Sequence, residues 1–559
     1  MKKCPECKRV YDDESLNYCL DDGQTLLLGP GPSESATKLL SAEPSEPTAR
    51  TEHLYRSDNS TPAVTAHPPR RTTIWLFSSL FLVLVISGLA AYRYWPAAGT
   101  QVDSIAVLPF ENNGGDADTD YLSDGLTDSL MYRLSQLPGL AVSPRSTVFR
   151  YKGKGADPIQ IGNDLGVSAV LSGRIVERGD DLTVSVELVD IRHNKLLWGE
   201  RYNRKISDLL ATQREISQEI TEKLRLTVAG NNSELAKHYT ENNEAYQLYL
   251  KGRFYWEKRS GVGLAKAIEY FDQSIKKDPT FALAYAGLAD CYAVPANQMA
   301  PNEAMPKAKA AAQRALELDE TLAEAHTALA RVYAAYEWNW PEAEKEFKRA
   351  IELDPRYPTA HQWYGGYLDT MGRHEESISE RRLALQLDPL SLILNFELAQ
   401  AFYYARDYDG AATQYKKTLE LEPNFPPAYQ FLPVAYEQKG DVDQAIATFL
   451  SSPRTNPVGG ESSFSRAGLA HAYALKGQKQ EALNILKELE SDSTQTYIPA
   501  TSIALVYAGL GDNDHTFEWL DKAYQEHAFQ LQWLNIEPRW DGLRSDPRFG
   551  EILRRIKLS

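Results

Sequence analysis

The chain has 559 residues, a net charge of −16 at pH 7 and a sequence pI near 5.3. This length exceeds what one hydrophobic core supports and predicts several domains. The acidic balance gives no electrostatic footprint for nucleic acid over the chain as a whole. Three of the four cysteines lie in the first 20 residues and the fourth is Cys291, so disulfide bonds cannot staple the long remainder of the chain.

The N-terminal segment, residues 1–27, has paired metal-ligand spacings. Cys4 and Cys7 form one C-x-x-C pair, and Cys19 and Asp22 form a second pair. Two such knuckles can present four ligands tetrahedrally to Zn²⁺, and a carboxylate is an acceptable ligand. The segment resembles the short zinc-ribbon heads of bacterial membrane proteins that begin CPxC and end CxxDG, with Asp22 where a ribbon usually has its last cysteine. We expect structural zinc; the alternative is three free cytosolic thiols.

Residues 28–70 are rich in Pro, Ser, Thr, Ala and Glu. Such a composition buries too little apolar surface to offset its ordering entropy, which predicts a disordered tether. The next stretch, Thr72–Tyr92, carries no charge and is bounded by Arg71 and Arg93. At about 1.5 Å per residue it reaches roughly 31 Å, which predicts a transmembrane helix.

The flanks of this apolar stretch predict its orientation. Arg70 and Arg71 precede it, only Arg93 follows it closely, and the chain does not begin with the apolar run of a cleavable signal. Lys and Arg near a span tend to stay cytoplasmic. We therefore expect a single-pass protein of the bacterial inner membrane, with a cytoplasmic N-terminus and periplasmic or extracellular C-terminal domains.

Residues 102–229 show an α/β pattern. Apolar runs and helical spacings predict, in chain order, a strand at 104–110, a helix at 121–137, a short strand, a helix near 157–165, three alternating strands at 169–177, 182–190 and 195–203, and a helix at 206–226. The runs SIAVLPF, YLSDGLTDSL and LWGERYNR, followed by Gln213, resemble the TolB amino-terminal-like or FlgO-like domain. That resemblance implies a periplasmic interaction domain.

Residues 245–524 repeat with a period of 34. An Asp-Pro pair or a stand-in recurs at this interval at Asp354-Pro355, Asp388-Pro389, Glu422-Pro423 and Asn456-Pro457. This is the tetratricopeptide signature, and we expect about eight helix pairs stacked in an all-α solenoid. Residues 525–559 are predicted to form a C-terminal cap. The fold class is therefore multidomain: a small zinc ribbon, one transmembrane helix, an α/β domain and the solenoid.

The first helix of each unit lines the concave face of such a solenoid, where positions 2, 5, 9, 12 and 13 of the unit point into the groove. In three central units this rule selects amides, acids and aromatic side chains: Gln362, Asp369, Phe396, Gln400, Tyr403, Tyr404, Gln430, Glu437 and Gln438. Such a set suits an extended protein or peptide partner. The alternative is a solvated face, with Phe396 and Tyr403 tucked against neighbours.

No phosphate-binding loop, H-E-x-x-H pair, G-x-S-x-G elbow or kinase motif set occurs in the sequence, and His326 and His361 occupy a packing position. We therefore predict a non-enzymatic, membrane-anchored interaction scaffold or sensor. The alternative is a signalling or transcription-linked regulator with the zinc head as output. Residues 1–27 carry more acidic than basic side chains, so nucleic acid is not an expected partner. Assembly of envelope enzymes or secretion machinery would suit the repeats equally.

Overall fold

The computed structural model describes residues 102–113, 120–135, 137, 139–155, 157–224, 240–258, 261–294, 299–451 and 462–558, and the pairs 2–3, 10–11 and 27–28. The chain divides into two compact units, Met1–Trp95 and Pro96–Ser559. Within the described residues, no helix combines the length and the apolar character needed to cross a bilayer. The predicted span Thr72–Tyr92 and nearly all of the predicted tether lie outside those residues.

In the first unit, three two-residue strands form a small antiparallel sheet: β1 (Lys2–Lys3), β2 (Val10–Tyr11) and β3 (Leu27–Leu28). Strand β1 is central and pairs with the other two. The predicted zinc ligands, Cys4, Cys7, Cys19 and Asp22, lie outside the described residues. The metal site therefore stays a prediction.

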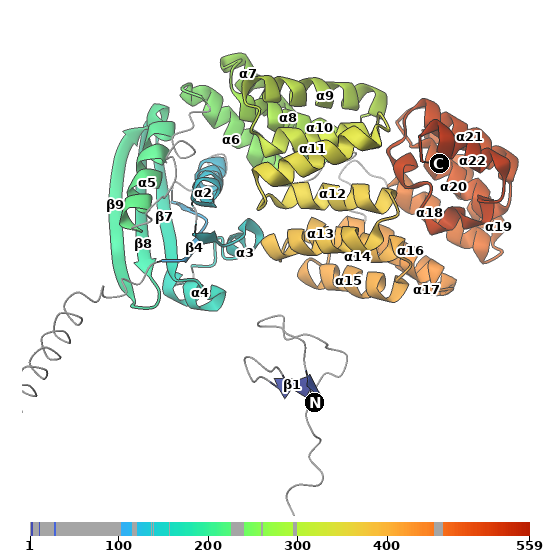
Figure 1. The fold of residues 1–559 in the computed structure, drawn as a ribbon, viewed down its shortest axis with the longest axis horizontal. Helices are drawn as coiled ribbons and strands as arrows, with labels where there is room; N and C mark the ends of the chain where they lie inside the picture. Colours follow the sequence, from blue (N-terminus) through green and yellow to red (C-terminus); the bar gives the residue numbers. More distant parts are fainter. Residues whose placement is uncertain are drawn as a thin grey trace, which may run out of the picture. The chain divides into compact units, whose positions relative to one another are not determined.

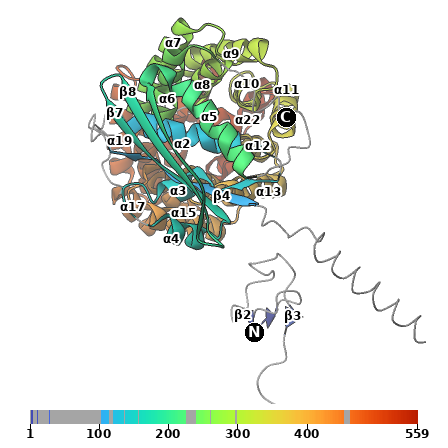
Figure 2. The same cartoon turned by 90° about the vertical axis from the view of Figure 1, so that its left-hand side faces the viewer.

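The second unit contains an α/β domain whose sheet has the strand order β6-β4-β7-β8-β9, with β5 paired to β7. Figure 2 shows the long strands β7 and β8 side by side. Strand β4 runs parallel to β6 and β7, while β7, β8 and β9 are antiparallel. The strands are β4 (Ser104–Val107), β5 (Glu111–Asn112), β6 (Ala141–Val142), β7 (Ala169–Arg178), β8 (Asp181–Asp190) and β9 (Lys195–Lys205). The three long strands agree with the alternating runs of the sequence.

Helices α2 (Asp120–Ser135) and α5 (Leu209–Lys223) pack against the sheet and each other (Figure 1). Shorter helices complete the domain: α3 (Arg145–Phe149), α4 (Pro158–Leu165) and the 3₁₀ turn η2 (Ile206–Asp208). Buried side chains alternate along β8, because successive residues of a strand point to opposite faces. The core then continues into the next helices, since Leu250 and Phe281 belong to the same buried cluster.

Gly125 explains how closely this domain approaches the first repeat. A Cβ atom at Gly125 would lie 3.0 Å from Cβ of Leu250, so the glycine lets α2 pack tightly on that residue. A buried network joins the same elements: the Tyr246 hydroxyl lies 2.8 Å from both Ser129 Oγ and Gln213 Oε1. The α/β domain and the first repeat therefore share one packed and hydrogen-bonded interface.

Eight helix pairs follow among the described residues, close to the units expected from the 34-residue period. The pairs are α6 (Asn243–Glu257) with α7 (Gly261–Lys277), α8 (Ala282–Ala293) with α9 (Pro301–Leu318), α10 (Ala323–Ala335) with α11 (Trp340–Leu353), α12 (Pro358–Thr370) with α13 (His374–Leu387), α14 (Leu392–Tyr404) with α15 (Tyr408–Leu421), α16 (Pro426–Gln438) with α17 (Val442–Leu450), α18 (Ser463–Leu475) with α19 (Lys479–Asp492), and α20 (Ala500–Leu510) with α21 (Asn513–Gln525).

Small residues set the helix spacing in this array. A Cβ atom at Gly252 or at Gly287 would come within 2.6 Å of the Phe271 ring, which is fully buried between the two helices that carry these glycines. The aromatic side chain of the second helix of one unit thus fills the space between that unit's first helix and the next.

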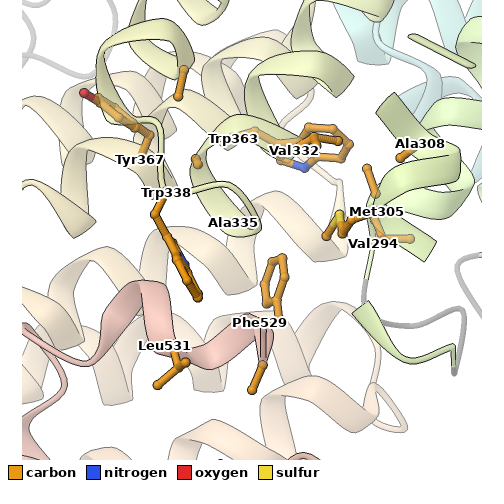
Figure 3. Close-up of a cluster of buried hydrophobic side chains, with 14 of the residues drawn as sticks. Val294, Met305, Ala308, Val332, Ala335, Trp338, Trp363, Tyr367, Phe529 and Leu531 are labelled. Atoms are coloured by element: carbon orange, nitrogen blue, oxygen red, sulfur yellow. The ribbon is translucent and has the colours of Figure 1, made fainter. Parts of the chain in front are cut away.

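After α21 the chain forms two 3₁₀ turns, η4 (Phe529–Trp533) and η5 (Pro538–Leu543), and helix α22 (Pro547–Arg555). This end packs on the third repeat as well as on the last one. The Trp340 indole N–H donates to the backbone oxygen of Ile556 at 3.1 Å, and Trp338 stacks on His527 at 4.5 Å between ring centroids. Figure 3 shows Phe529 and Leu531 near Trp338 and Trp363 in the largest buried cluster.

Candidate functional site

The candidate site is the inner face of the solenoid, which we define as the surface formed by the first helices α6, α8, α10, α12, α14, α16, α18 and α20. Its central part is covered by residues 528–543, here called the C-terminal segment. Arg331 of α10 lies over the Phe529 ring at 4.8 Å. Tyr404 of α14 stacks on Trp533 with 6.1 Å between ring centroids. The chain itself therefore occupies the place where a peptide was expected.

Polar contacts hold the same segment further along. The Tyr403 hydroxyl donates to Glu537 Oε1 at 2.5 Å, and Arg406 forms a two-point ion pair with Asp541. Arg539 lies 2.9 Å from Glu537 and also over the Phe464 ring of α18. The C-terminal segment thus crosses the inner face from α10 to α18.

The predicted groove residues are therefore mostly interior, which corrects the expectation of an open groove. The exposed fractions are 0% for Asp369, 1% for Tyr403, 2% for Gln362, 3% for Tyr404, 5% for Glu437, 6% for Phe396 and 8% for Gln400. Gln430 and Gln438 are half-buried. The alternative of a solvated face is also wrong for these seven buried side chains. Phe396 and Tyr403 do pack against neighbours, as that alternative stated.

Several of these residues are used within the solenoid itself. Asp369 forms an ion pair with Arg381 at 3.0 Å, and both side chains are almost fully buried. The Gln362 amide donates to Glu397 at 2.8 Å. Phe396 packs against Tyr415 of its own unit and against aromatic rings of the next. A rule based on position alone could not distinguish these interior roles from partner contacts.

The C-terminal segment is too strongly packed to act as a loose lid. It buries six large apolar side chains: Phe529, Leu531, Leu534, Ile536, Trp540 and Leu543. Full burial of one such side chain contributes about 1.5–3 kcal/mol, so the set contributes on the order of 10 kcal/mol as an upper estimate. A partner would have to replace all of that to displace the segment. We conclude that this part of the inner face is closed as part of the fold.

Electrostatics support a permanent closure. Burial alone would raise the pKa of Glu537, but the charge of Arg539 and hydrogen bonds from Arg539 and Tyr403 lower that pKa overall. Burial also raises the pKa of the Tyr403 hydroxyl well above its ordinary value, and the neighbouring Glu537 adds to the shift. Glu537 is therefore a paired anion beneath a neutral tyrosine, which is a satisfied buried arrangement.

The inner face stays open at its beginning, where it meets the α/β domain. A hollow of about 330 Å³ lies there, bordered by α2 and α3 of the α/β domain and by the first helices of the opening repeats. Tyr249 and Arg253 of α6, Asp290 of α8 and Glu324 of α10 line one side. Tyr357, in the turn before α12, lines it as well. This volume falls within the range of small-ligand pockets, and pockets often form where two domains meet.

Charged side chains dominate the polar lining of the hollow. Six are carboxylic acids and five are arginines: Asp128, Glu257, Asp290, Glu324, Asp354 and Asp388, with Arg133, Arg145, Arg214, Arg253 and Arg356. Arg214 is also paired with Glu241, which is not part of the lining. The balance is therefore negative.

For three of these acids, burial raises the pKa more than the neighbouring arginines lower it. It raises the pKa of Asp128 to about 6 although Arg145 lies 2.8 Å away. It also raises the pKa of Asp388 to about 6, against a hydrogen bond from the Ser146 hydroxyl. The pKa of Glu324 is raised by burial and by the neighbouring charge of Asp354. Burial thus disfavours the ionised form of Asp128, Asp388 and Glu324.

Contacts to the turns between repeats also hold the walls of the hollow together. Arg356, which precedes α12, donates to the backbone oxygen of Leu140 at 3.1 Å. The Ser146 hydroxyl of α3 donates to Asp388, which precedes α14. Both contacts join the α/β domain to turns between repeats. A ligand in the hollow would touch both domains at once.

The hollow residues were missed by the sequence reasoning, although the signal existed. Asp290 follows Leu288-Ala289 as Gln400 follows Leu398-Ala399, which places Asp290 at the same groove position of an earlier unit. The groove rule was applied only to the three central units. It could not have indicated which units stay open, because that depends on the α/β domain and the C-terminal segment.

The two histidines have packing roles, as predicted. His361 is 2% exposed, and its two ring nitrogens lie 2.6 Å from Glu380 and 2.9 Å from the backbone oxygen of Pro355. His326 repeats this pattern one unit earlier with Glu346 and the backbone oxygen of Glu320. Each histidine thus ties the first helix of its unit to the second helix and to the preceding turn.

Comparison with protein families supports the repeats and revises the α/β domain. Residues 396–459 match a tetratricopeptide repeat model. Residues 100–222 match the second domain of HilA/YgeH-like transcriptional regulators. This is a different family from the TolB amino-terminal-like domain that the sequence motifs suggested, and that finer resemblance is not shown. The chain thus carries tetratricopeptide repeats beside a sheet domain.

Individual relatives match only in part. A putative adenylate cyclase 3 of Rhizobium meliloti is 32% identical over 187 residues, which are 33% of this chain and 32% of that protein. The chain spans about a third of the length of that relative and 9% and 12% of two further ones. Among solved structures, PilF of Pseudomonas aeruginosa is 22% identical, covering 39% of this chain and 94% of PilF with a TM-score of 0.30. The Cut9–Hcn1 tetramer structure is 17% identical, covering 62% and 63% with a TM-score of 0.39.

Proposed function

We propose that this protein is a membrane-anchored, non-enzymatic interaction protein that recognises a partner at the hollow between its α/β domain and its first repeats. The observation that carries this proposal is the position of the hollow. Both domains line it, and none of the residues that line it belongs to the C-terminal segment. A partner bound there would contact both domains, and it would either respond to their relative position or fix that position. Such a site suits a scaffold or a sensor.

A photo-crosslinking experiment in cells tests this proposal. A photoreactive amino acid replaces Leu387, which lines the hollow at the end of α13. The matched control replaces Leu383, which is on the same helix, is 37% exposed and does not line the hollow. We expect a discrete protein adduct at position 387 and none at position 383. No adduct at 387, or the same adducts at both positions, would overturn the proposal.

The membrane anchor is part of the proposal and rests on the uncharged stretch Thr72–Tyr92. We infer a single span with the N-terminus in the cytoplasm of a bacterial cell and the repeats outside. A reporter that is active only outside the cytoplasm, fused after residue 230, should be active. A stable, membrane-bound but silent fusion would reverse the orientation, and a fusion that stays in the soluble fraction would remove the span.

The head is proposed to hold one structural zinc ion through Cys4, Cys7, Cys19 and Asp22. The pairing of Lys2–Lys3 with Val10–Tyr11 and with Leu27–Leu28 supports this proposal, because it brings together three pairs of residues from this segment. The purified full chain should contain about one zinc per molecule under reducing conditions. Cys7→Ser should lose most of it, whereas Cys291→Ser, at a buried lone cysteine far along the chain, should retain it. Equal zinc content in both variants would exclude the site.

A second candidate function is a signalling or transcription-linked regulator. The match of residues 100–222 to a domain of HilA/YgeH-like transcriptional regulators favours it, although that name describes those proteins. In this case the zinc head would be the output. Deletion of residues 1–27 should then change transcript levels while leaving the crosslink at position 387 intact. Unchanged transcripts would leave the interaction protein as the remaining function.

A further inference from the structure

A second surface lies outside the hollow, on the first helix pair, α6 and α7, which pack side by side (Figure 1). On α6 the spacing i, i+3, i+4, i+7 places four residues on one helix face: Lys251, Phe254, Tyr255 and Lys258. On α7 the spacing i, i+4, i+8 aligns Val262, Lys266 and Tyr270 in the same way. We call these residues, together with Tyr121 of α2, the lysine–aromatic face. The lining of the hollow includes none of these described residues.

The rings of the lysine–aromatic face are stacked across the two helices. Tyr255 and Tyr270 lie nearly parallel, with 5.5 Å between ring centroids and 11° between the ring planes. Phe254 meets Tyr255 edge-on at 5.3 Å. These three aromatic side chains are half-buried, and Val262, one turn before Lys266 on α7, is 57% exposed. The face therefore offers apolar surface as well as charge.

Three ammonium groups lie over these rings. The Nζ atoms of Lys258 and Lys266 each lie 4.9 Å from the centroid of the Tyr255 ring. The Nζ atom of Lys251 lies 4.5 Å from the centroid of the Tyr121 ring. A ring face attracts a cation through its quadrupole, but it carries no net charge and does not neutralise the cation. The face therefore stays positively charged.

The three lysines of this face differ from other lysines of the same helices in their partners. Among the residues that the structure describes, no carboxylate lies within ion-pair distance of these three ammonium groups. By contrast, Lys277 at the end of α7 pairs with Glu244 at 2.7 Å. The acid of α6 that is nearest in sequence to Lys258, Glu257, pairs with Arg253. In a chain with a net charge of −16, three such lysines on one face favour an anionic partner outside the chain.

We propose that the lysine–aromatic face binds an acidic segment of a partner protein, in which Asp or Glu alternates with apolar side chains. The ammonium groups pair with the carboxylates, and the rings and Val262 pack against the apolar side chains. Because no residue of this face lines the hollow, the inference goes beyond the proposed function and does not depend on it.

The net charge of the chain favours a short acidic segment over a dense polyanion. A nucleic acid or an anionic membrane is repelled by a chain that carries −16. A short segment is affected mainly by the charges that it touches, because charges beyond about 8 Å are screened at physiological ionic strength. The aromatic rings between the lysines also match a partner whose charges are separated by apolar groups.

Fluorescence anisotropy with the purified full chain tests the proposal. The probe is a dye-labelled, capped peptide Glu-Leu-Glu-Leu-Glu-Leu, and its control carries Gln in place of every Glu. We expect saturable binding of the acidic peptide, which weakens about tenfold between about 20 and 200 mM NaCl as the charges are screened. We expect no binding of the control peptide. Absence of binding, or equal binding of both peptides, would overturn the proposal.

Two further probes distinguish the other anionic occupants. They are vesicles of phosphatidylglycerol and a single-stranded oligodeoxynucleotide, each measured as a competitor of the labelled acidic peptide. We expect neither to displace the peptide at low concentration. Tighter binding of the vesicles or of the oligonucleotide than of the peptide would overturn the acidic segment as the occupant.

Paired substitutions locate the binding. The double variant Lys258→Gln, Lys266→Gln removes two ammonium groups and should weaken the acidic peptide about tenfold or more at low salt. The matched control is Lys276→Gln with Lys277→Gln, which makes the same change in net charge at exposed positions at the end of α7. The control should bind like the parent chain. Equal weakening in both double variants would mean that only net charge matters and would overturn the proposal.

Folding of the variants can be verified directly. Lys258 and Lys266 are exposed, so the melting temperature of their double variant should stay close to that of the parent chain. Unchanged affinity in this folded variant would overturn the proposal.

Discussion

Two stretches of the same inner face have opposite roles. Along α12, α14 and α16 the groove positions are buried by their own neighbours and by the C-terminal segment, as for Tyr403, which is 1% exposed. Along α6 and α8, and at Glu324 near the start of α10, the inner face borders a hollow of about 330 Å³. The helices are alike in type and spacing. What differs is the segment that packs onto them, so the site is defined by sequences outside the repeats.

The largest effect should come from the closed stretch. Phe529→Ala removes a ring that is 5% exposed and contacts Arg331, and should lower the free energy of unfolding by about 3–5 kcal/mol. Leu450→Ala, at a side chain that is 60% exposed, is the control and should change it by less than about 0.5 kcal/mol. Urea unfolding of the purified chain measures both. Similar small values would mean that the segment is a loose lid.

The next largest effect on stability should come from the hydrogen bond between Tyr403 and Glu537. Tyr403→Phe removes the hydroxyl that donates to the buried Glu537, and should destabilise the chain by about 1–3 kcal/mol. A double-mutant cycle with Glu537→Gln isolates this bond, and we expect a coupling free energy of about 1 kcal/mol or more. Additive effects of the two changes would show that the hydroxyl and the carboxylate do not interact in solution.

The sequence predicted the helix pairs that form both stretches, but not which stretch is closed and which is open. The 34-residue spacing of Asp-Pro pairs was enough for the helix pairs, because it reflects a local or nearest-neighbour feature. The contact between Tyr403 and Glu537 joins residues 134 positions apart, and Glu537 lies beyond the last repeat, so no periodic signal indicates it. The hollow likewise depends on Gly125, which lets α2 pack against Leu250. The repeat pattern does not indicate that contact between α2 and Leu250.

Acidification should change the stability contributions of the two stretches in opposite directions. The pKa of Asp388 is raised from 3.8 to about 6, mainly by burial, so the folded state binds this proton more tightly than the unfolded state does. The contribution of Asp388 to the free energy of unfolding therefore falls as pH rises from about 4 to 6. Asp388→Asn should therefore gain stability relative to the parent chain as pH rises through this window. The pKa of Glu537 is lowered instead, so its contribution is present above 4.5 and is lost as pH falls. Glu537→Gln should cost more at pH 7 than at pH 4. Melting temperatures between pH 4 and 7.5 measure both differences, and parallel pH profiles for the two variants would contradict the contrast.

The smallest effect on stability should come from Glu324→Gln in the open stretch. Its side chain is half-buried, and its pKa is raised by burial, with Asp354 adding to the shift. The ionised carboxylate is therefore not a source of stability in the folded chain, and a neutral amide of the same shape relieves a repulsion at neutral pH. We expect the free energy of unfolding to change by less than about 0.5 kcal/mol, or to rise slightly. A loss of 2 kcal/mol or more would instead place Glu324 in a structural ion pair, and the open stretch would then be built for stability like the closed one.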